Sequence, residues 1–265
     1  MSDKPIQKRA ALERRLRKYF AHARPRFEGV FQFARSLESI GQVAVFGGAL
    51  RDFYLNGPAH SPRDVDLVID TSDLAALEKY LLPFAPIRNK FGGYRLLVGQ
   101  WPVDLWPVSS TWAFRMGHVE NAGLQSLPKT TFLTSDAIVY VLGEEKVYCT
   151  DQYLIHLNQR LLDVNLEQNP NPLGCVVRAM RASVLDRFAL QPNLMQFVVE
   201  HYREFEAELP EALAAAFGYR VNFEAMQEAI QEMESCLREK LCSSYRVSPQ
   251  RWKQEIEPDK SMSLF

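Results

Sequence analysis

The chain has 265 residues, 47% of them hydrophobic and 24% charged, which is enough to bury one large core or two small ones. Its formal net charge of −1 at pH 7 indicates neither a nucleic-acid nor a membrane partner. No apolar run approaches the length of a membrane span and no signal peptide opens the chain, so we expect a cytoplasmic protein without a membrane partner.

The charges are unevenly distributed. Residues 1–28 carry nine Lys or Arg against three Asp or Glu, so this segment is locally basic. It could bind the phosphate backbone of a nucleic acid; a solvated face, or one docked on the acidic C-terminal helices, is the alternative. The four cysteines have neither Cys-x-x-Cys spacing nor histidines at zinc-like spacing, so we expect buried or free thiols in a reducing compartment.

Apolar periodicity and turn residues predict the elements in chain order. The first part of the chain contains predicted helices at 7–21, 27–40, 49–55 and 74–82, and predicted strands at 43–46, 65–69, 94–98, 103–106, 137–142 and 146–149. After about residue 151 strand patterns stop, and helices are predicted at 173–190, 193–208, 210–217 and 223–241. We therefore predict an α+β fold, with a mixed sheet flanked by helices and then a small all-helical region. Its parts are basic helices (1–40), the sheet domain (41–165) and the helical region (166–265).

Two carboxylates lie on the predicted strand at 65–69 and directly before it. Side chains alternate along a strand, so Val65 and its alternate neighbours point into the core while Asp64 and Asp66 share the other face. Two nearby carboxylates both stay ionised when a cation lies between them. A hard divalent ion such as Mg²⁺ suits oxygen ligands; solvated carboxylates at a strand end are the alternative.

A third carboxylate, Asp104, lies between core-like residues on the predicted strand at 103–106. Three acidic groups on adjacent strands are the usual protein contribution to a two-metal site, in which one ion activates an attacking hydroxyl and the other binds the leaving phosphate group. A capping or turn carboxylate is the alternative for Asp104 alone. The nearby Lys90 and Arg95 could contact a nucleotide from a loop, but a plain strand entry is the simpler interpretation.

Two glycines, Gly47 and Gly48, stand between the predicted strand at 43–46 and the following helix. Glycine allows the backbone to approach a ligand closely, and the N–H groups of a helix N-terminus bind phosphate. Arg51, one turn into the helix, could add a bidentate phosphate contact. A Gly-Gly turn alone is usually structural, but this one is followed 16 residues later by Asp64.

These motifs resemble a known family. The segment 47–52, Gly-Gly-Ala-Leu-Arg-Asp, followed by Asp-Val-Asp at 64–66, resembles the head of tRNA nucleotidyltransferases (CCA-adding enzymes) and poly(A) polymerases, within the DNA polymerase β-like superfamily. That family opens with Gly-Gly-x-Val-Arg-Asp and then Asp-x-Asp. The resemblance covers roughly residues 43–190 and implies a nucleotidyltransferase sheet.

The likeness is thinner after the head. The segment 129–140 stands where the family has Arg-Arg-Asp-Phe-Thr-x-Asn-Ala, which is associated with sugar and phosphate recognition, and 171–181 resembles its Glu-Asp-Pro-Leu-Arg-x-Leu-Arg-Ala block. The resemblance assigns nucleotide contacts to Lys129 and Ser135 in the first block and to Arg178 and Arg181 in the second. Because the first block departs from the family, ribo- and deoxyribonucleotide substrates both stay open.

We therefore expect a nucleotidyltransferase that uses Mg²⁺ or Mn²⁺ to transfer a nucleoside monophosphate from an NTP or dNTP to a hydroxyl of an oligonucleotide, tRNA end, nucleotide or protein. The acceptor could be RNA or DNA. The residues after 165 number about 100, too few for a tRNA-measuring body, so we expect an activity other than CCA addition, such as that of a bacterial toxin or phage-defence component. A catalytically idle module that binds nucleotide or nucleic acid is the alternative.

Overall fold

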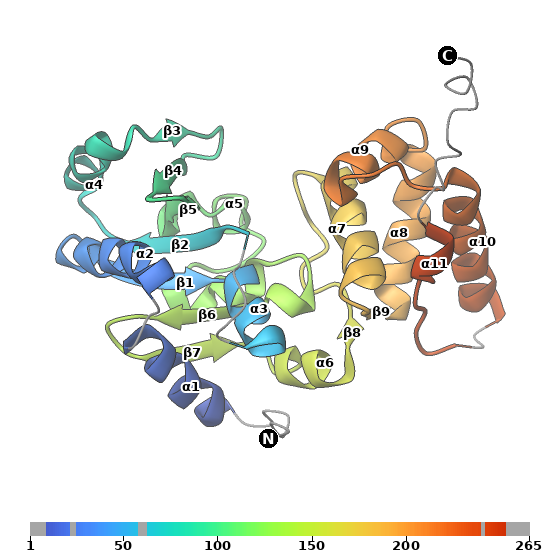
Figure 1. Ribbon diagram of the computed structural model, residues 1–265, viewed down its shortest axis with the longest axis horizontal. Coiled ribbons are helices and arrows are strands. Elements are labelled where there is room, and N and C mark those ends of the chain that lie inside the picture. The colour runs from blue at the N-terminus through green and yellow to red at the C-terminus, as the bar shows by residue number, and fades with distance from the viewer. Residues whose placement is uncertain (1–8, 22–24, 58–62, 240–241, 253–265) are drawn as a thin grey trace, which may run out of the picture. The chain divides into compact units, whose positions relative to one another are not determined.

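The computed structural model describes residues 9–21, 25–57, 63–239 and 242–252. The chain divides into two compact units: the first comprises residues up to 159 together with 164–169, and the second comprises 160–163 and the residues from 170 onward (Figure 1). Helices α1 (Arg9–Ala21) and α2 (Pro25–Ser36) belong to the same unit as the sheet, whereas the division by sequence treats 1–40 separately. Among the described residues, no helix combines the length and the apolar character that a membrane span requires.

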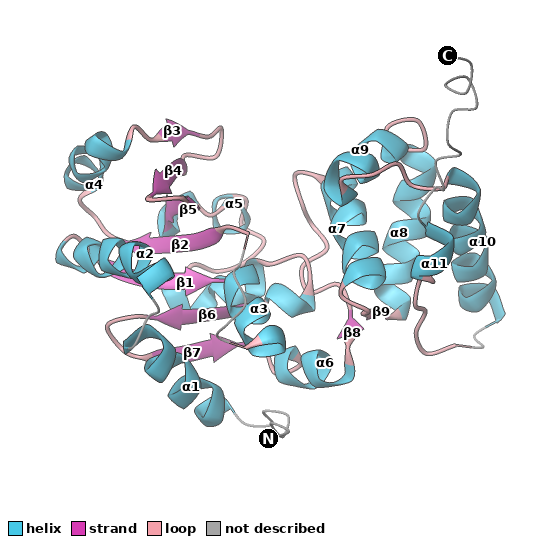
Figure 2. Ribbon diagram, in the orientation of Figure 1, coloured by secondary structure: helices cyan, strands magenta, loops and turns pink. Residues whose placement is uncertain are grey.

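The first unit is built on a seven-stranded mixed sheet with the strand order β3-β4-β5-β2-β1-β6-β7 (Figure 2). The strands are β1 (Gln42–Phe46), β2 (Val65–Asp70), β3 (Ile87–Arg88), β4 (Tyr94–Val98), β5 (Trp101–Pro107), β6 (Ile138–Val141) and β7 (Lys146–Cys149). β2 and β5 are parallel, and the other neighbouring pairs are antiparallel. This sheet and its helices confirm the predicted α+β fold.

Helices and short 3-10 segments connect these strands. After α1 and α2, the α-helices of the first unit are α3 (Gly48–Asn56), α4 (Leu74–Leu81), α5 (Trp112–Arg115) and α6 (Tyr153–Gln159). The 3-10 segments are η1 (Leu37–Ser39), η2 (Leu82–Phe84), η3 (Val108–Ser110), η4 (Leu124–Thr130) and η5 (Thr134–Asp136). Asp73 caps α4 by accepting a 2.8 Å hydrogen bond from the backbone N–H of Ala76, which satisfies one of the donors that a helix start leaves without a partner.

The two faces of the sheet are covered differently. Alternate residues of β2, from Val65 onward, are buried on the face that α1 and α2 cover, and we name this the helical face. There Phe20 of α1 stacks on Tyr140 of β6 with ring centroids 4.9 Å apart, and it meets Phe31 of α2 edge-on. On the opposite face, named the site face, Val68 is buried in an apolar cluster with Leu127 of η4 and other residues. Asp66 and Asp104 lie on the site face and are only half-buried.

The second unit is helical, as predicted, but contains a short strand pair. Its helices are α7 (Pro172–Leu185), α8 (Pro192–Glu204), α9 (Leu209–Phe217), α10 (Phe223–Glu239) and α11 (Pro249–Trp252), and its strands are β8 (Leu161–Leu162) and β9 (Ala189–Leu190), which pair in parallel. The prediction that strands stop after residue 151 is therefore wrong. The predicted helix at 173–190 ends early, at Leu185, because Arg187 takes a left-handed φ of 61° that a helix does not continue through.

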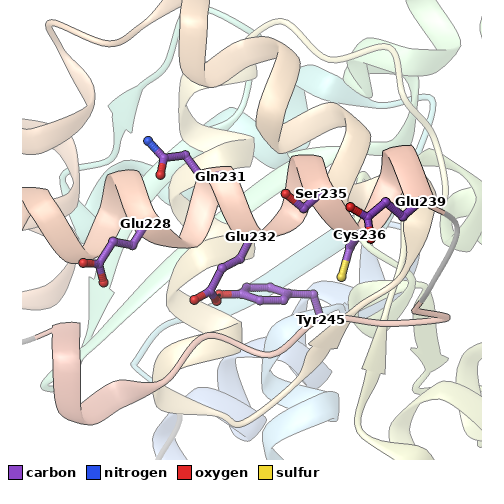
Figure 3. Close-up of a pocket in the computed structure, with 7 residues that line it drawn as sticks. All are labelled: Glu228, Gln231, Glu232, Ser235, Cys236, Glu239 and Tyr245. Atoms are coloured by element: carbon purple, nitrogen blue, oxygen red, sulfur yellow. The ribbon is translucent and has the colours of Figure 1, made fainter.

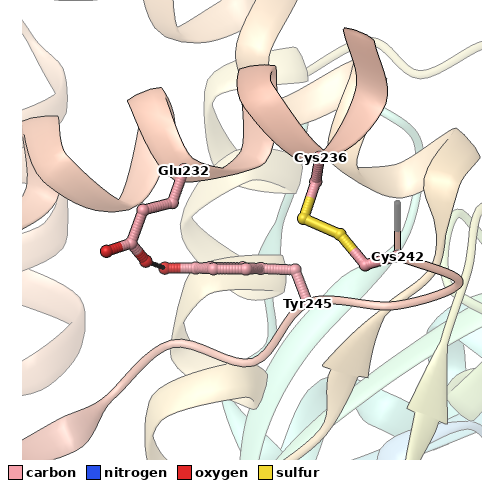
Figure 4. The surroundings of a disulfide bond; sticks show 4 residues. All are labelled: Glu232, Cys236, Cys242 and Tyr245. Carbon is pink, nitrogen blue, oxygen red and sulfur yellow. Dashed lines mark hydrogen bonds between the residues drawn. A yellow bond between two sulfur atoms is a disulfide. The ribbon is translucent and has the colours of Figure 1, made fainter. Parts of the chain in front are cut away.

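An open cavity of about 490 Å³ lies in the second unit beside α10, lined by three glutamates and by Gln231, Ser235, Cys236 and Tyr245 (Figure 3). At its rim Cys236 and Cys242 are joined as a disulfide, with Cα atoms 5.5 Å apart, and Tyr245 donates a 2.6 Å hydrogen bond to Glu232 (Figure 4). The expectation of buried or free thiols is wrong for this pair. Cys242 lies within bonding distance of Cys236 at a sequence separation of six, an approach that the spacing alone does not show. Cys149 and Cys175 are free thiols.

Candidate nucleotide and metal site

The strand register brings two of the three predicted carboxylates together. Asp66 of β2 and Asp104 of β5 are direct partners in the parallel pair. Partnered residues of neighbouring strands point to the same face, and their backbones are roughly 4.8 Å apart. They belong to one row that crosses the whole sheet, made of Ile87, Arg95, Asp104, Asp66, Phe46, Val139 and Tyr148.

The third carboxylate, Asp64, stands one residue before β2. It precedes Asp66 by two residues, and its negative charge acts on Arg95 together with that of Asp66. Its Oδ2 lies 3.5 Å from Nη2 of the exposed Arg63. The structure therefore brings Asp64 to the same end of the sheet as the pair formed by Asp66 and Asp104.

Arg95 of β4 holds Asp104 from the other side. Its Nε and Nη2 donate to the two carboxylate oxygens of Asp104 at 2.8 and 2.6 Å, which is a bidentate pair. The hydrogen bond and charge of Asp104 raise the pKa of Arg95, and the negative charges of Asp64 and Asp66 raise it further, while burial opposes the change. All three carboxylates thus act on one cation. The sequence interpretation of Arg95 as a plain strand entry missed this contact, because it depends on the pairing of β4 with β5.

The glycine turn lies at the same end of the sheet. β1 ends at Phe46, the partner of Asp66, so the turn begins immediately beyond the carboxylate row. Gly47 has φ 64° and ψ −120°, a conformation that disfavours residues with a side chain, and it is the N-cap of α3. Its backbone N–H donates to the carbonyl oxygen of Ile138 at 3.0 Å. The first N–H groups of α3 therefore point out of the helix next to the carboxylates.

Arg51 is fixed under this turn by two carboxylates. It is bonded to Asp136 of η5 through Nη1, and its Nε donates to Oδ1 of Asp52 at 3.0 Å. Its Nη2 lies 3.5 Å from the position that a Cβ on Gly48 would take, so the guanidinium packs against the glycine turn. The arrangement shows that Arg51 braces the turn; its predicted phosphate contact remains a prediction.

Asp136 is the residue of this region that sequence reasoning missed. The resemblance placed Ser135 at the family's Asn, but Ser135 is only 1% exposed and presents no side chain to solvent. The family block ends in Asn-Ala, and a shift by one residue aligns that ending with Asp136 and Ala137. That shift is the signal that could have identified Asp136.

The other predicted nucleotide contacts lie outside the carboxylate row. Lys129 is exposed in η4. Arg178 and Arg181 belong to α7 in the second unit, where Arg178 is exposed and donates to the sulfur of Cys175 at 3.5 Å. A nucleotide contact of Lys129, Arg178 or Arg181 therefore remains a prediction from the resemblance.

The carboxylates supply the hard oxygen donors that Mg²⁺ and Mn²⁺ prefer. Within the described ranges, however, no three His, Cys, Asp or Glu side chains form a group that could hold a metal ion. Both oxygens of Asp104 are bonded to Arg95, and Asp64 lies against Arg63. The three carboxylates thus fit a divalent ion in their chemistry and in their position on the sheet. For Asp104 to become a ligand of that ion, Arg95 must leave the carboxylate of Asp104.

This sheet and the helices around it have the fold of solved CCA-adding enzymes. A CCA-adding enzyme with CTP matches with a TM-score of 0.58 and 17% identity over 88% of this chain and 56% of that chain. The Thermotoga maritima CCA-adding enzyme complexed with tRNA gives 0.57 and 17% over 86% and 54%, and a tRNA-processing enzyme with CTP gives 0.53 and 18% over 79% and 57%.

The chain therefore spans a little over half the length of these enzymes. No family model and no curated protein matches the sequence. The predicted resemblance to the head of tRNA nucleotidyltransferases is confirmed at the level of the fold, which the chain shares with them across both its sheet and its helices.

Proposed function

We propose that this protein is a metal-dependent nucleotidyltransferase. It transfers a nucleoside monophosphate from an NTP or dNTP to a hydroxyl acceptor and releases pyrophosphate. The observation that carries the proposal is the direct pairing of Asp66 with Asp104 on parallel strands, immediately beside the Gly47 turn. Carboxylates and a helix N-terminus are the two kinds of group that such a transfer needs, one for cations and one for phosphate.

The carboxylates have separate roles in this proposal. Asp64 and Asp66 would hold both divalent ions, Mg²⁺ or Mn²⁺, and Asp104 would hold the ion at the attacking hydroxyl. When bound, the ions supply positive charge that favours deprotonation of the hydroxyl and stabilises the leaving pyrophosphate. The strand pairing of Asp66 with Asp104 fixes the carboxylates relative to each other before substrate arrives, which reduces the ordering needed for reaction.

The glycine turn positions the triphosphate. Backbone N–H groups at the start of α3 can donate to phosphate oxygens, because no carbonyl within the helix accepts from them. The turn keeps its shape because Arg51 is bonded to Asp52 and Asp136 beneath it. Arg51 thus acts through the turn, and the proposal adds a phosphate contact of its guanidinium at the same edge of the sheet.

The proposed substrates follow from the fold and the resemblance. CCA-adding enzymes with this fold have been solved with CTP, with ATP and with tRNA, which supports a nucleoside triphosphate as donor and a nucleic acid as one acceptor class. An oligonucleotide, a tRNA end, a nucleotide or a protein are the acceptors we propose to test. We also propose a cytoplasmic location, and the resemblance extends the proposal to a toxin or phage-defence setting.

The proposal is tested with each α-labelled ribo- and deoxyribonucleotide, Mg²⁺ or Mn²⁺, and tRNA, DNA or no primer. We expect label in one product class, and labelled RNA, free oligomer or labelled protein would identify the acceptor. Chelation of the divalent ion should abolish the label.

A second candidate is a catalytically idle module that binds nucleotide or nucleic acid. The bidentate pair of Arg95 and Asp104 favours it, because that pair occupies one of the proposed metal ligands. Stabilisation by Mg²⁺ with a triphosphate, without pyrophosphate release under any primer condition, would support this candidate and contradict the enzyme.

A further inference from the structure

Arg95 is a cation built into the carboxylate row. It is the partner of Asp104 in the pairing of β4 with β5, just as Asp66 is its partner in the pairing with β2. Asp104 therefore stands between a cation on one side and a carboxylate on the other. Both oxygens of Asp104 accept from the guanidinium, at 2.8 and 2.6 Å.

The two partners are buried to different degrees. The side chain of Arg95 is 66% exposed, whereas that of Asp104 is 23% exposed. A long, largely exposed side chain can move without disturbing the core, but the shorter Asp104 is fixed on a central strand. The contact can therefore open by rotation of Arg95 alone while Asp104 stays in line with Asp66.

A divalent ion at Asp104 would use the same oxygens that Arg95 occupies. Two cations cannot share those oxygens at close range without strong repulsion. We propose that Arg95 is a positioning residue that holds Asp104 in the absence of the ion and releases it when the ion binds. The inference rests on the ion site of the proposed function.

The positive charge of Arg95 and its bidentate contact with Asp104 also stabilise the carboxylates before an ion binds. Three carboxylates at one end of a sheet repel one another, and the planar guanidinium neutralises part of that charge while fixing the orientation of Asp104. The guanidinium thus keeps the ligand aligned before the ion arrives. The cost is that the ion must displace it.

The test is Mn²⁺ binding, followed by electron paramagnetic resonance and calorimetry without nucleotide. Arg95→Gln removes the competing cation, so we expect Mn²⁺ to bind about tenfold more tightly than to the wild type, the factor that corresponds to losing one charge-assisted hydrogen-bond pair. Arg95→Lys keeps the charge but loses the bidentate geometry, so it should give an intermediate affinity.

The matched control is Arg88→Gln. Arg88 is equally exposed, at 65%, and it also pairs with a carboxylate, Glu78, at 3.4 Å, but its partner on β4 is Tyr94, whose side chain is on the helical face. Because Arg88 contacts none of the proposed ion ligands, loss of its charge should change Mn²⁺ affinity less than about twofold.

The background variant Asp104→Asn separates pairing from general electrostatics. If Arg95 acts through Asp104, the effect of Arg95→Gln should fall below about threefold in that background. A tenfold effect of Arg95→Gln that persists in the Asp104→Asn background overturns the role of Arg95. So does an unchanged Mn²⁺ affinity in Arg95→Gln while Asp66→Asn still removes binding. Either result leaves the proposed ion site intact. Absence of Mn²⁺ binding in both the wild type and Arg95→Gln overturns the ion site and the inference together.

Discussion

Replacement of Asp136 by Asn tests the brace under the glycine turn. The side chains of Arg51 and Asp136 are only 20% and 18% exposed, so their contact is weakly screened by solvent. A hydrogen bond to a charged group contributes about 1.5–3 kcal/mol. Because Arg51 keeps Asp52 as a partner at 3.0 Å, its charge is not left uncompensated, and we expect Asp136→Asn to lower the free energy of unfolding by about 1.5–2 kcal/mol.

Urea denaturation of the wild type, Asp136→Asn, Arg51→Met and the double variant measures this contact as a coupling free energy, which we expect to be at least about 1 kcal/mol. Glu145→Gln is the control, because Glu145 pairs with Arg17 at 2.7 Å with both side chains 51% exposed, and such a surface pair contributes less than about 1 kcal/mol. Additive effects of Asp136→Asn and Arg51→Met would refute the brace. So would a cost for Asp136→Asn no larger than that of Glu145→Gln.

Further predictions concern the backbone and pH. Gly47→Ala should lower the free energy of unfolding in urea by about 1–3 kcal/mol, because the φ of 64° at this position strains any residue with a side chain. The control is Gly29→Ala inside α2, where no atom lies within 4 Å of the added Cβ, and this variant should raise the free energy of unfolding by about 0.5–1 kcal/mol. Equal effects of the two substitutions would contradict the strain at Gly47. Burial raises the pKa of Tyr140 to about 12, so its stabilising contribution is complete below about pH 10, the unfolded value, and is lost as pH rises toward 12. Thermal melting between pH 10 and 12 should show that the wild type loses about 2–3 kcal/mol of stability, the value for two pKa units, and that Tyr140→Phe loses less. The same dependence of stability on pH in both proteins would contradict this role of Tyr140.

Most of the sheet is predictable from local sequence because each inner strand carries its own pattern. The strand at 94–98 has the predicted bounds. β1 and β2 are each one residue longer than predicted, and β5 is three residues longer. The sequence pattern does not predict β3, because both of its residues, Ile87 and Arg88, are exposed and show no alternation of buried and exposed positions. Its pairing with β4 arises from the turn that Asn89 and Gly93 close at 2.8 Å.

The candidate site was predictable only in part. Alternation along one strand is sufficient to group Asp64 with Asp66, since it needs no information from elsewhere in the chain. The alignment of Asp66 with Asp104, and of Asp104 with Arg95, depends on how separate strands pair. Local periodicity does not encode register between distant strands, and the brace from Asp136 to Arg51 joins residues 85 positions apart for the same reason.

Ion-dependent nucleotide transfer is tested most directly by comparing Asp66→Asn with Asp70→Asn. Both residues lie on β2 with side chains on the same face, but Asp70 is four residues farther along, roughly 13 Å from the carboxylate row. With an α-labelled triphosphate and Mg²⁺, we expect the wild type and Asp70→Asn to form product at similar rates and Asp66→Asn to lose at least about a hundredfold with its fold intact by circular dichroism. Product formation by Asp66→Asn at the rate of Asp70→Asn would contradict the assignment.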